Sequence, residues 1–243
     1  MKWGFMTPQH IQTLVLAAVM ILALYYGLKN RSQKVQTAVL FPLSLSGIAA
    51  IIYNLVTWGS PLEYLPLHLC SVNALILPVA VLTRNKTLGN LLLLWCVGAL
   101  VALVANFEMV EAELFGEVFN FFFFPHVFEF GIPILLFKLG LVKKDAACIR
   151  STLSITMCLY TLVHLCNVGI NHWCRMVGNG IRVNYMFSLE PTNPLSALLY
   201  RVIPHAYWHM YTLVPLLGVY LLLVYAPELT ARYRAVDACH QTV

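Results

Sequence analysis

Two polar residues inside hydrophobic runs have the residue types of a nucleophile and a base. Cys70 lies in the stretch LPLHLCSVN at 65–73, and His126 lies in a second apolar run that also contains Glu129. A cysteine thiolate attacks ester carbonyls when a neighbouring histidine takes its proton and a third group orients that histidine. His126 and Glu129 are three residues apart and therefore share a helix face. The pattern predicts a cysteine nucleophile, a histidine base and an orienting carboxylate.

The surroundings of Cys70 favour this interpretation. Pro66 suits the first turn of a helix, because its missing N–H would have no partner there. The positive end of the helix dipole would then favour a thiolate at Cys70. Asn73 shares a face with Cys70, and either its amide or the backbone N–H groups of this turn could stabilise an oxyanion. His68 lies about 200° from Cys70 around a regular helix, which favours a supporting role for it.

Two polar stripes occur at helical spacing in the last hydrophobic runs: His164, Asn167 and Asn171 in one, and Arg201, His205 and His209 in the other. Each stripe must face the bundle interior or a watered cavity, because facing lipid would leave its polar groups unsatisfied. Arginine suits bidentate contacts with phosphate. The candidates for contacts with a phosphate head group are Arg201 and His205, with Asn184 and Tyr185 from the long connection at 172–197.

Membrane-spanning helices must position these residues. The 243-residue chain is 60% hydrophobic and only 10% charged, whereas a soluble domain carries about 25% charged residues. Runs of about 20 apolar residues are long enough to span a bilayer. Seven such runs lie near 9–28, 36–57, 65–83, 88–106, 118–138, 149–171 and 198–225. We therefore expect an all-α, polytopic membrane protein with one seven-helix transmembrane domain over 1–243.

The charges between the runs predict the orientation. One set of ends carries most of the basic residues, namely Lys29, Arg31, Lys34, Arg84, Lys86, Lys138, Lys143, Lys144, Arg150, Arg232 and Arg234. The other ends hold Lys2, Arg175, Arg182 and Arg201 together with Glu63, Glu108, Glu111, Glu113, Glu117 and Glu190. Because cytoplasmic loops are rich in Lys and Arg, we expect the N-terminus outside and the C-terminus in the cytoplasm. The net charge of +5 then reflects topology, and no nucleic-acid partner is expected.

Metal binding and simple packing are the alternative interpretations of these residues. Three pairs resemble metal ligands, His68 with Cys70, His164 with Cys166 and His205 with His209, of which only the last has helical spacing for one ion. A single cysteine in a membrane helix is usually a small apolar filler. We expect no metal and no cofactor. The sequence contains no phosphate loop, no dinucleotide fingerprint and no Gly-x-Ser-x-Gly motif.

Three motifs together resemble a known family: LPLHLCSVN, FFFFPHVFEFGIPILL and VNYMFSLEPTNPLSALL. They resemble the YwaF-like integral membrane proteins of bacteria, which are similar to the eukaryotic transmembrane protein 164 family, over about 36 to 225. The resemblance implies seven membrane helices and a bacterial cytoplasmic membrane location. The eukaryotic relatives are described as acyltransferases that pass fatty acyl chains between phospholipids, ether-linked ones included, with a cysteine and a histidine. The matching residues here are Cys70 and His126. More distant kin with a threonine nucleophile hydrolyse lipid esters.

The sequence therefore predicts an enzyme that remodels phospholipids in the bilayer. Cys70 would accept an acyl chain from a phospholipid, with His126 as base, and a lysophospholipid hydroxyl or water would resolve the thioester. The alternative is a lipid or small-solute transporter or binding protein. A transporter typically has interrupted helices near the midplane and related halves. Pro42, Pro78 and Pro133 could interrupt helices, but we find no internal repeat. An enzyme site of this kind should be closed below and open sideways to the outer leaflet.

Overall fold

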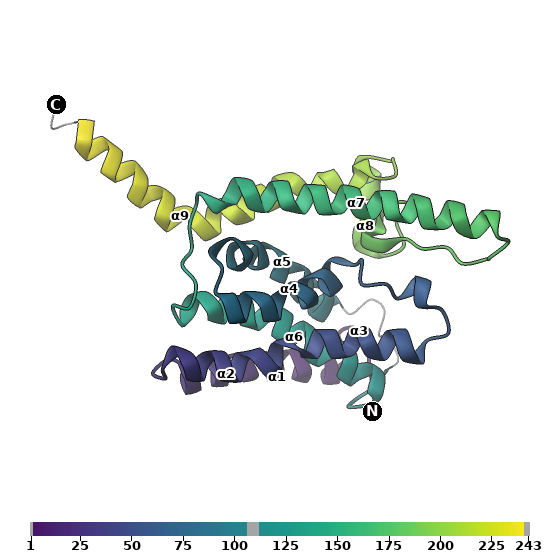
Figure 1. Ribbon diagram of the computed structural model, residues 1–243, viewed down its shortest axis with the longest axis horizontal. Helices are drawn as coiled ribbons and strands as arrows, with labels where there is room; N and C mark the ends of the chain where they lie inside the picture. Colours follow the sequence, from purple (N-terminus) through teal and green to yellow (C-terminus); the bar gives the residue numbers. More distant parts are fainter. Residues whose placement is uncertain (1, 106–111, 241–243) are drawn as a thin grey trace.

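The computed structural model describes residues 2–105 and 112–240, which form a helical bundle with one short strand pair (Figure 1). The elements, in chain order, are β1 (Lys2–Trp3), α1 (Pro8–Leu28), α2 (Gln33–Ser44), α3 (Ser46–Thr57), η1 (Pro61–Glu63), α4 (Leu69–Thr83), α5 (Lys86–Ala105), β2 (Ala112–Glu113), α6 (Glu117–Lys138), α7 (Cys148–Met176), η2 (Tyr185–Phe187), α8 (Pro194–Val202), η3 (Trp208–Thr212) and α9 (Leu213–His240). Outside the described residues lie Glu108, Glu111 and the last position of the predicted run 88–106, as do the side chains of Lys2, Arg232 and Arg234.

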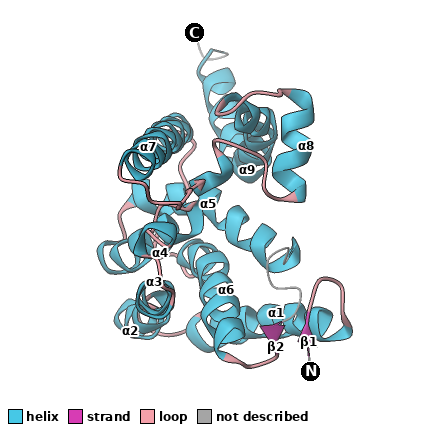
Figure 2. Ribbon diagram, turned by 90° about the vertical axis from the view of Figure 1, so that its right-hand side faces the viewer, coloured by secondary structure: helices cyan, strands magenta, loops and turns pink. Residues whose placement is uncertain are grey.

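Helices α4, α5 and α6 form the centre of the bundle. They pack on one another and contribute buried side chains such as Leu77, Trp95 and Leu136 to a single core cluster. Helices α1, α2 and α3 cover one side of this centre, while α7 and α9 cover the other (Figure 2). The outer helices expose apolar side chains, including Leu22 and Leu162. A bundle that is hydrophobic both inside and outside is suited to a lipid environment.

Six helical segments within the described residues are long and apolar enough to cross a membrane: Pro8–Leu28, Gln33–Thr57, Lys86–Ala105, Glu117–Lys138, Cys148–Met176 and Trp208–Ala231. The predicted all-α membrane architecture is therefore confirmed. The run predicted at 65–83 differs, because its helix α4 has only 15 residues. These rise about 22 Å, which is less than the roughly 30 Å hydrocarbon core of a bilayer. Pro66 disfavours helical backbone at Leu65, and the helix begins at Leu69.

The last predicted run, 198–225, is not one continuous helix. Helix α8 ends at Val202, and Ile203 adopts extended backbone with φ −129° and ψ 97°. The proline that follows explains this break, because a proline ring disfavours the helical region at the preceding residue. Tyr207, just before η3, has a positive φ of 66° with ψ −54°. The expected stripe of Arg201, His205 and His209 along one helix is therefore wrong.

The prolines inside the other predicted runs behave differently from one another. Helix α2 ends two residues after Pro42, and Leu45 separates it from α3 with its N–H donating to the Pro42 carbonyl at 3.2 Å. Helices α4 and α6, by contrast, continue through Pro78 and Pro133. The single candidate span Gln33–Thr57 therefore consists of two helices that meet at Leu45.

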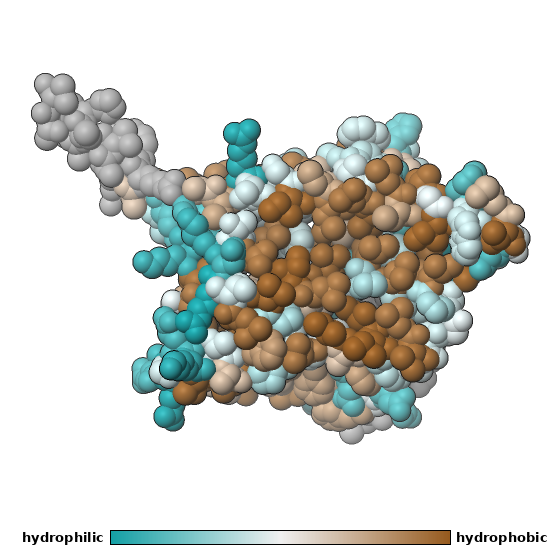
Figure 3. Space-filling model, viewed as in Figure 1, coloured by the Kyte–Doolittle hydropathy of each residue, from teal (hydrophilic) through white to brown (hydrophobic). Residues whose placement is uncertain are grey.

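Charged residues separate to the two ends of the bundle. We call one the basic end, which carries the connections α1–α2, α4–α5 and α6–α7 with Lys29, Arg31, Lys34, Arg84, Lys86, Lys138, Lys143, Lys144 and Arg150. Figure 3 shows hydrophilic side chains gathered at this end beside a broad hydrophobic face. The opposite end, the loop end, carries η1, residues 112–116 and 177–193, with Glu63, Glu113, Glu117 and Glu190.

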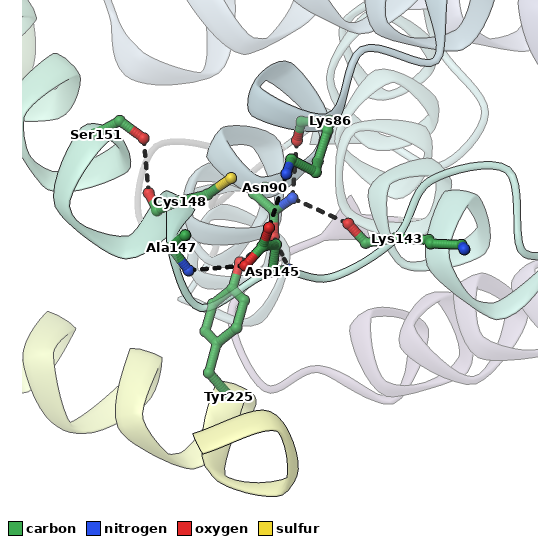
Figure 4. Close-up of polar contacts among 8 residues, drawn as sticks. All are labelled: Lys86, Asn90, Lys143, Asp145, Ala147, Cys148, Ser151 and Tyr225. Carbon is green, nitrogen blue, oxygen red and sulfur yellow. Dashed lines mark hydrogen bonds and ion pairs between the residues drawn. The ribbon is translucent and has the colours of Figure 1, made fainter. Parts of the chain in front are cut away.

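At the basic end Asn90 joins α5, the α6–α7 connection and α9 (Figure 4). Its Nδ2 donates to the carbonyls of Lys86 at 2.8 Å and Lys143 at 3.2 Å. Its Oδ1 accepts from the Asp145 N–H at 3.2 Å and from the Tyr225 hydroxyl. Every donor of this amide is therefore in use, and so are both lone pairs of its oxygen.

We predict that Asn90→Ala lowers the free energy of unfolding by about 2 kcal/mol or more, because it leaves several buried groups without partners. The measurement is the midpoint of thermal unfolding in detergent micelles. Asn30→Ala, at an exposed position of the α1–α2 turn, is the matched control and should unfold like the wild type. Equal midpoints for the two variants would contradict the role of Asn90 as a joint.

Candidate active site

Cys70 is the second residue of α4 and is partly buried. The helix begins three residues later than expected, so Pro66 lies before it and His68 is its N-cap. The first N–H groups of a helix have no partners within it. Those at 69–71 lie in the same helical turn as Cys70, and the positive end of the helix dipole favours the ionised form of its thiol.

A backbone contact sets α4 against α6. Pro133 has no N–H, so the carbonyl of Glu129, four residues earlier, lacks its usual helical donor. Asn73 supplies a donor instead, with its Nδ2 lying 3.4 Å from that carbonyl oxygen. The contact confirms that α4 and α6 are neighbours, which the pairing of Cys70 with His126 requires.

This contact places Cys70 and His126 at the same level of the bundle. Helices α4 and α6 both begin at the loop end and run to the basic end (Figure 1). Cys70 precedes Asn73 by three residues, and His126 precedes Glu129 by three. Each therefore lies about 4.5 Å nearer the loop end than the contact.

Helix α3 packs against the contact between α4 and α6, on the side of Cys70 and His126 that faces the basic end. A methyl group at Gly47 would lie 2.5 Å from Ala74 Cβ and 2.8 Å from Glu129 Oε1, so only glycine permits this approach. Glu129 is 3% exposed, and its Oε2 has no hydrogen-bond partner among the described residues. The fully buried Asn73 likewise has no described partner for its Oδ1. The Asn73 amide nitrogen therefore serves the junction between α4 and α6.

His126 is held in the tautomer that a base needs. Its Nδ1 lies 2.7 Å from the carbonyl oxygen of Phe122, and a carbonyl can only accept, so Nδ1 carries the proton. In the neutral ring Nε2 then has the lone pair that can take a proton. The Phe122 carbonyl orients the ring, whereas the Glu129 carboxyl, expected in that role, lies against Gly47.

Residues 183–188, which we call the roof, cover the beginning of α4. The N–H of Met186 donates to His68 Nδ1 at 3.3 Å. The His68 ring packs against Tyr185 and Phe187, with ring centroids 5.3 Å and 5.6 Å away. His68, the N-cap of α4, therefore joins the roof to the start of that helix.

Two asparagines of α7 hold the roof. Asn171 bonds both backbone groups of Val183 at 2.8 Å, and Asn167 bonds both backbone groups of Tyr185 at 2.8 and 2.9 Å. Asn167 and Asn171 are four residues apart on α7, a rise of about 6 Å, and Val183 and Tyr185 are two residues apart in the roof, about 6.6 Å of extended chain. The spacing of the two asparagines therefore matches that of their two partners. The sequence predicted the polar face of α7 but did not identify the chain's own backbone as its partner.

The roof contains strained backbone. Met186 and Phe187 have φ values of 52° and 54°, and Tyr207, whose N–H donates to Ser188 at 2.6 Å, has φ 66°. Left-handed backbone at such residues costs about 1–3 kcal/mol each and collects at functional sites. His164 adds a further bond to the roof, with its Nδ1 3.1 Å from Ser188 Oγ.

The residues predicted to contact a head group are in different settings. The Asn184 amide forms hydrogen bonds within its own loop: it donates to the Glu190 carbonyl and accepts from the Leu189 N–H. Tyr185 is buried, and its hydroxyl donates to the carbonyl of Leu62. Arg201 and His205 are exposed at the loop end.

No metal centre is formed by the described residues, in which no group of three or more His, Cys, Asp and Glu side chains could hold an ion. The pair with helical spacing does not chelate. His209 is fully buried and donates its Nδ1–H to the carbonyl of the exposed His205 at 3.0 Å.

Comparison with known proteins identifies a family to which the chain is similar. The model of the TMEM164 family matches residues 5–225, which include Cys70, His126 and the roof. No curated protein matches the chain, and no solved structure does.

We predict that Asn167→Ala loosens the roof, because the backbone groups of Tyr185 lose both partners. Hydrogen–deuterium exchange of the purified protein should become faster at 183–188, by about tenfold or more for a loss of 1.4 kcal/mol. Asn193→Ala, which removes the cap of α8, is the control and should leave exchange at 183–188 unchanged. Unaltered exchange in Asn167→Ala would show that the roof is held by other contacts.

Proposed function

The chain belongs to the TMEM164 family, and from this membership and the geometry of α4 and α6 we propose that it is a membrane acyltransferase that moves fatty acyl chains between phospholipids. One observation carries the proposal. Cys70, in the first turn of α4, lies level with His126, whose Nε2 holds the lone pair. A thiol and a proton-accepting imidazole at one level of two contacting helices suit acyl transfer.

The proposed first step transfers the acyl chain to the enzyme. His126 Nε2 takes the proton of the Cys70 thiol, and the sulfur attacks the carbonyl carbon of a phospholipid ester. The N–H groups at 69–71 stabilise the oxyanion. The ester C–O bond then breaks, His126 returns the proton to the departing oxygen, and a lysophospholipid leaves.

The proposed second step releases the acyl chain. The hydroxyl of an acceptor lysophospholipid gives its proton to His126 and attacks the thioester carbonyl, and the C–S bond breaks. Cys70 regains its proton, and a new phospholipid forms. Water in place of the acceptor would give hydrolysis, so the same residues also support a lipid ester hydrolase.

Exposed tryptophans support the proposed position of this site close to a membrane–water interface. Trp58, Trp173 and Trp208 are 42%, 49% and 55% exposed, and all three lie at the loop end. Tryptophan gathers at membrane–water interfaces. Phospholipid esters lie just beneath their head groups, which is close to the level of the first turn of α4.

We extend the proposal to topology and location. The short helix α4 is the third of seven spans, completed by the residues before it, in a bacterial cytoplasmic membrane. The basic end lies in the cytoplasm, because cytoplasmic loops are rich in Lys and Arg. This orientation puts the N-terminus, the roof and Cys70 on the outer side.

Head-group contacts are assigned by exposure. Arg201 and His205 are exposed at the loop end, where a guanidinium can bind phosphate with two parallel hydrogen bonds. Asn184 and Tyr185 contribute indirectly, because their side chains hold the roof and its loop.

The competing function is non-enzymatic lipid or small-solute transport or binding. One observation favours it: the span Gln33–Thr57 is interrupted at Leu45, close to Gly47 and the buried Glu129. Transporters place their sites at such interrupted helices.

We predict that the purified wild type, incubated with mixed phospholipids, gains the mass of an acyl chain, and that Cys70→Ala does not. His126→Gln should slow adduct formation by about 10²–10⁴-fold, the usual contribution of a general base. Intact-mass spectrometry measures both. Cys166→Ala, at an exposed cysteine of α7, is the control and should retain the adduct. Lipid that co-purifies without adduct or turnover would favour transport or binding instead.

We also predict opposite outcomes for two reporters fused after Val243. Green fluorescent protein should fluoresce there, and alkaline phosphatase should be inactive. Both outcomes are those of a cytoplasmic C-terminus, which the basic end predicts. A fusion of alkaline phosphatase after Ser60 should be active. The reverse pattern would invert the proposed orientation.

A further inference from the structure

An apolar groove lies between α3 and α6 on the outside of the bundle. Its volume is about 400 Å³, and it is lined by Ala49, Ile52, Tyr53, Val56, Thr57 and Phe121. Ile52 and Val56 are 56% and 80% exposed, so the groove opens away from the core. Figure 3 shows hydrophobic side chains across the face that contains α3. An apolar opening of this kind faces the acyl chains of the bilayer.

The floor of the groove is an aromatic pair that bridges the two helices. Helix α3 touches α6 closely at Gly47, where no side chain intervenes. Two turns nearer the loop end, the Tyr53 ring stacks on Phe121, with centroids 3.9 Å apart and planes 7° apart. The two rings separate α3 from α6 at this level, and the groove lies open beside them.

The end of the groove nearest the loop end is anionic. The Tyr53 hydroxyl donates to Glu117 Oε2 at 2.9 Å. Glu117 is exposed, and no described side chain forms an ion pair with it. Glu113, also exposed, lies four residues earlier and outside the groove. Glu117 lies one helical turn from Phe121, so charge gives way to apolar surface within about 6 Å.

We propose that this groove binds a phospholipid with an ammonium-bearing head group, taken from the leaflet at the loop end. Its acyl chain lies against Ile52, Val56 and Phe121, and its ammonium group lies at the Glu117 carboxylate beside the Tyr53 ring. The carboxylate attracts the cation, and an aromatic face adds a cation–π contact. Lipids with a net negative head group are disfavoured by Glu117.

The bound lipid would lie beside the helix that carries His126. Glu117 and His126 are nine residues apart on α6, about 13.5 Å along its axis. A head group at Glu117 therefore directs the ester groups toward the level of the candidate site. Binding in the groove needs neither Cys70 nor His126, so it can be tested without acyl chemistry.

The test is native mass spectrometry of the full chain in detergent with phosphatidylethanolamine and phosphatidylglycerol of identical acyl chains. The wild type should prefer phosphatidylethanolamine, and Glu117→Gln should reduce this preference by about three- to fivefold, the size of an exposed ion pair. Glu113→Gln, with the same charge change outside the groove, should retain most of it. Cys70→Ala, which removes the proposed acyl chemistry, should keep the full preference.

A second variant tests the apolar part. Ala49→Phe fills the groove and should weaken binding of both lipids alike, at an unfolding temperature close to that of the wild type. An unchanged preference in Glu117→Gln, an equal loss in Glu113→Gln, or undiminished binding in Ala49→Phe would each overturn the proposal.

Discussion

The carbonyl oxygen of Glu129 is the group on which the candidate site depends. Pro133 deprives it of a helical donor, and a bilayer offers no water in its place. Asn73 provides the donor, and in doing so fixes α4 against α6. A slip of α4 by one residue would turn Cys70 by about 100° around the helix. The register of α4 on α6 therefore follows from satisfying one backbone group.

The same physical solution recurs at both ends of the bundle. Asn90 joins three segments at the basic end, and Asn167 and Asn171 hold the roof at the loop end. An amide provides donors and acceptors together and carries no charge, so it can satisfy backbone groups inside a membrane protein at low cost. Asparagine side chains therefore hold the roof over the start of α4 and join three segments at the basic end.

Hydropathy and charge predicted the architecture but not the ends of every helix. The hydrophobic runs and the separation of charges follow from composition, which a sliding window reads well. Proline acts on single residues instead. Pro204 interrupts the last run at Ile203, and Pro66 disfavours helical backbone at Leu65, ahead of the start of α4 at Leu69, although both stretches are apolar. A window that averages hydrophobicity cannot register either effect.

Helical periodicity identifies a face but not what lies against it. The stripe of Asn167 and Asn171 was visible in the sequence, whereas its match to the extended roof depended on the fold. That match has a consequence for access to Cys70. The roof covers the beginning of α4, and the junction at Gly47 is packed below it. The roof therefore lies between the first turn of α4, which carries Cys70, and the loop end.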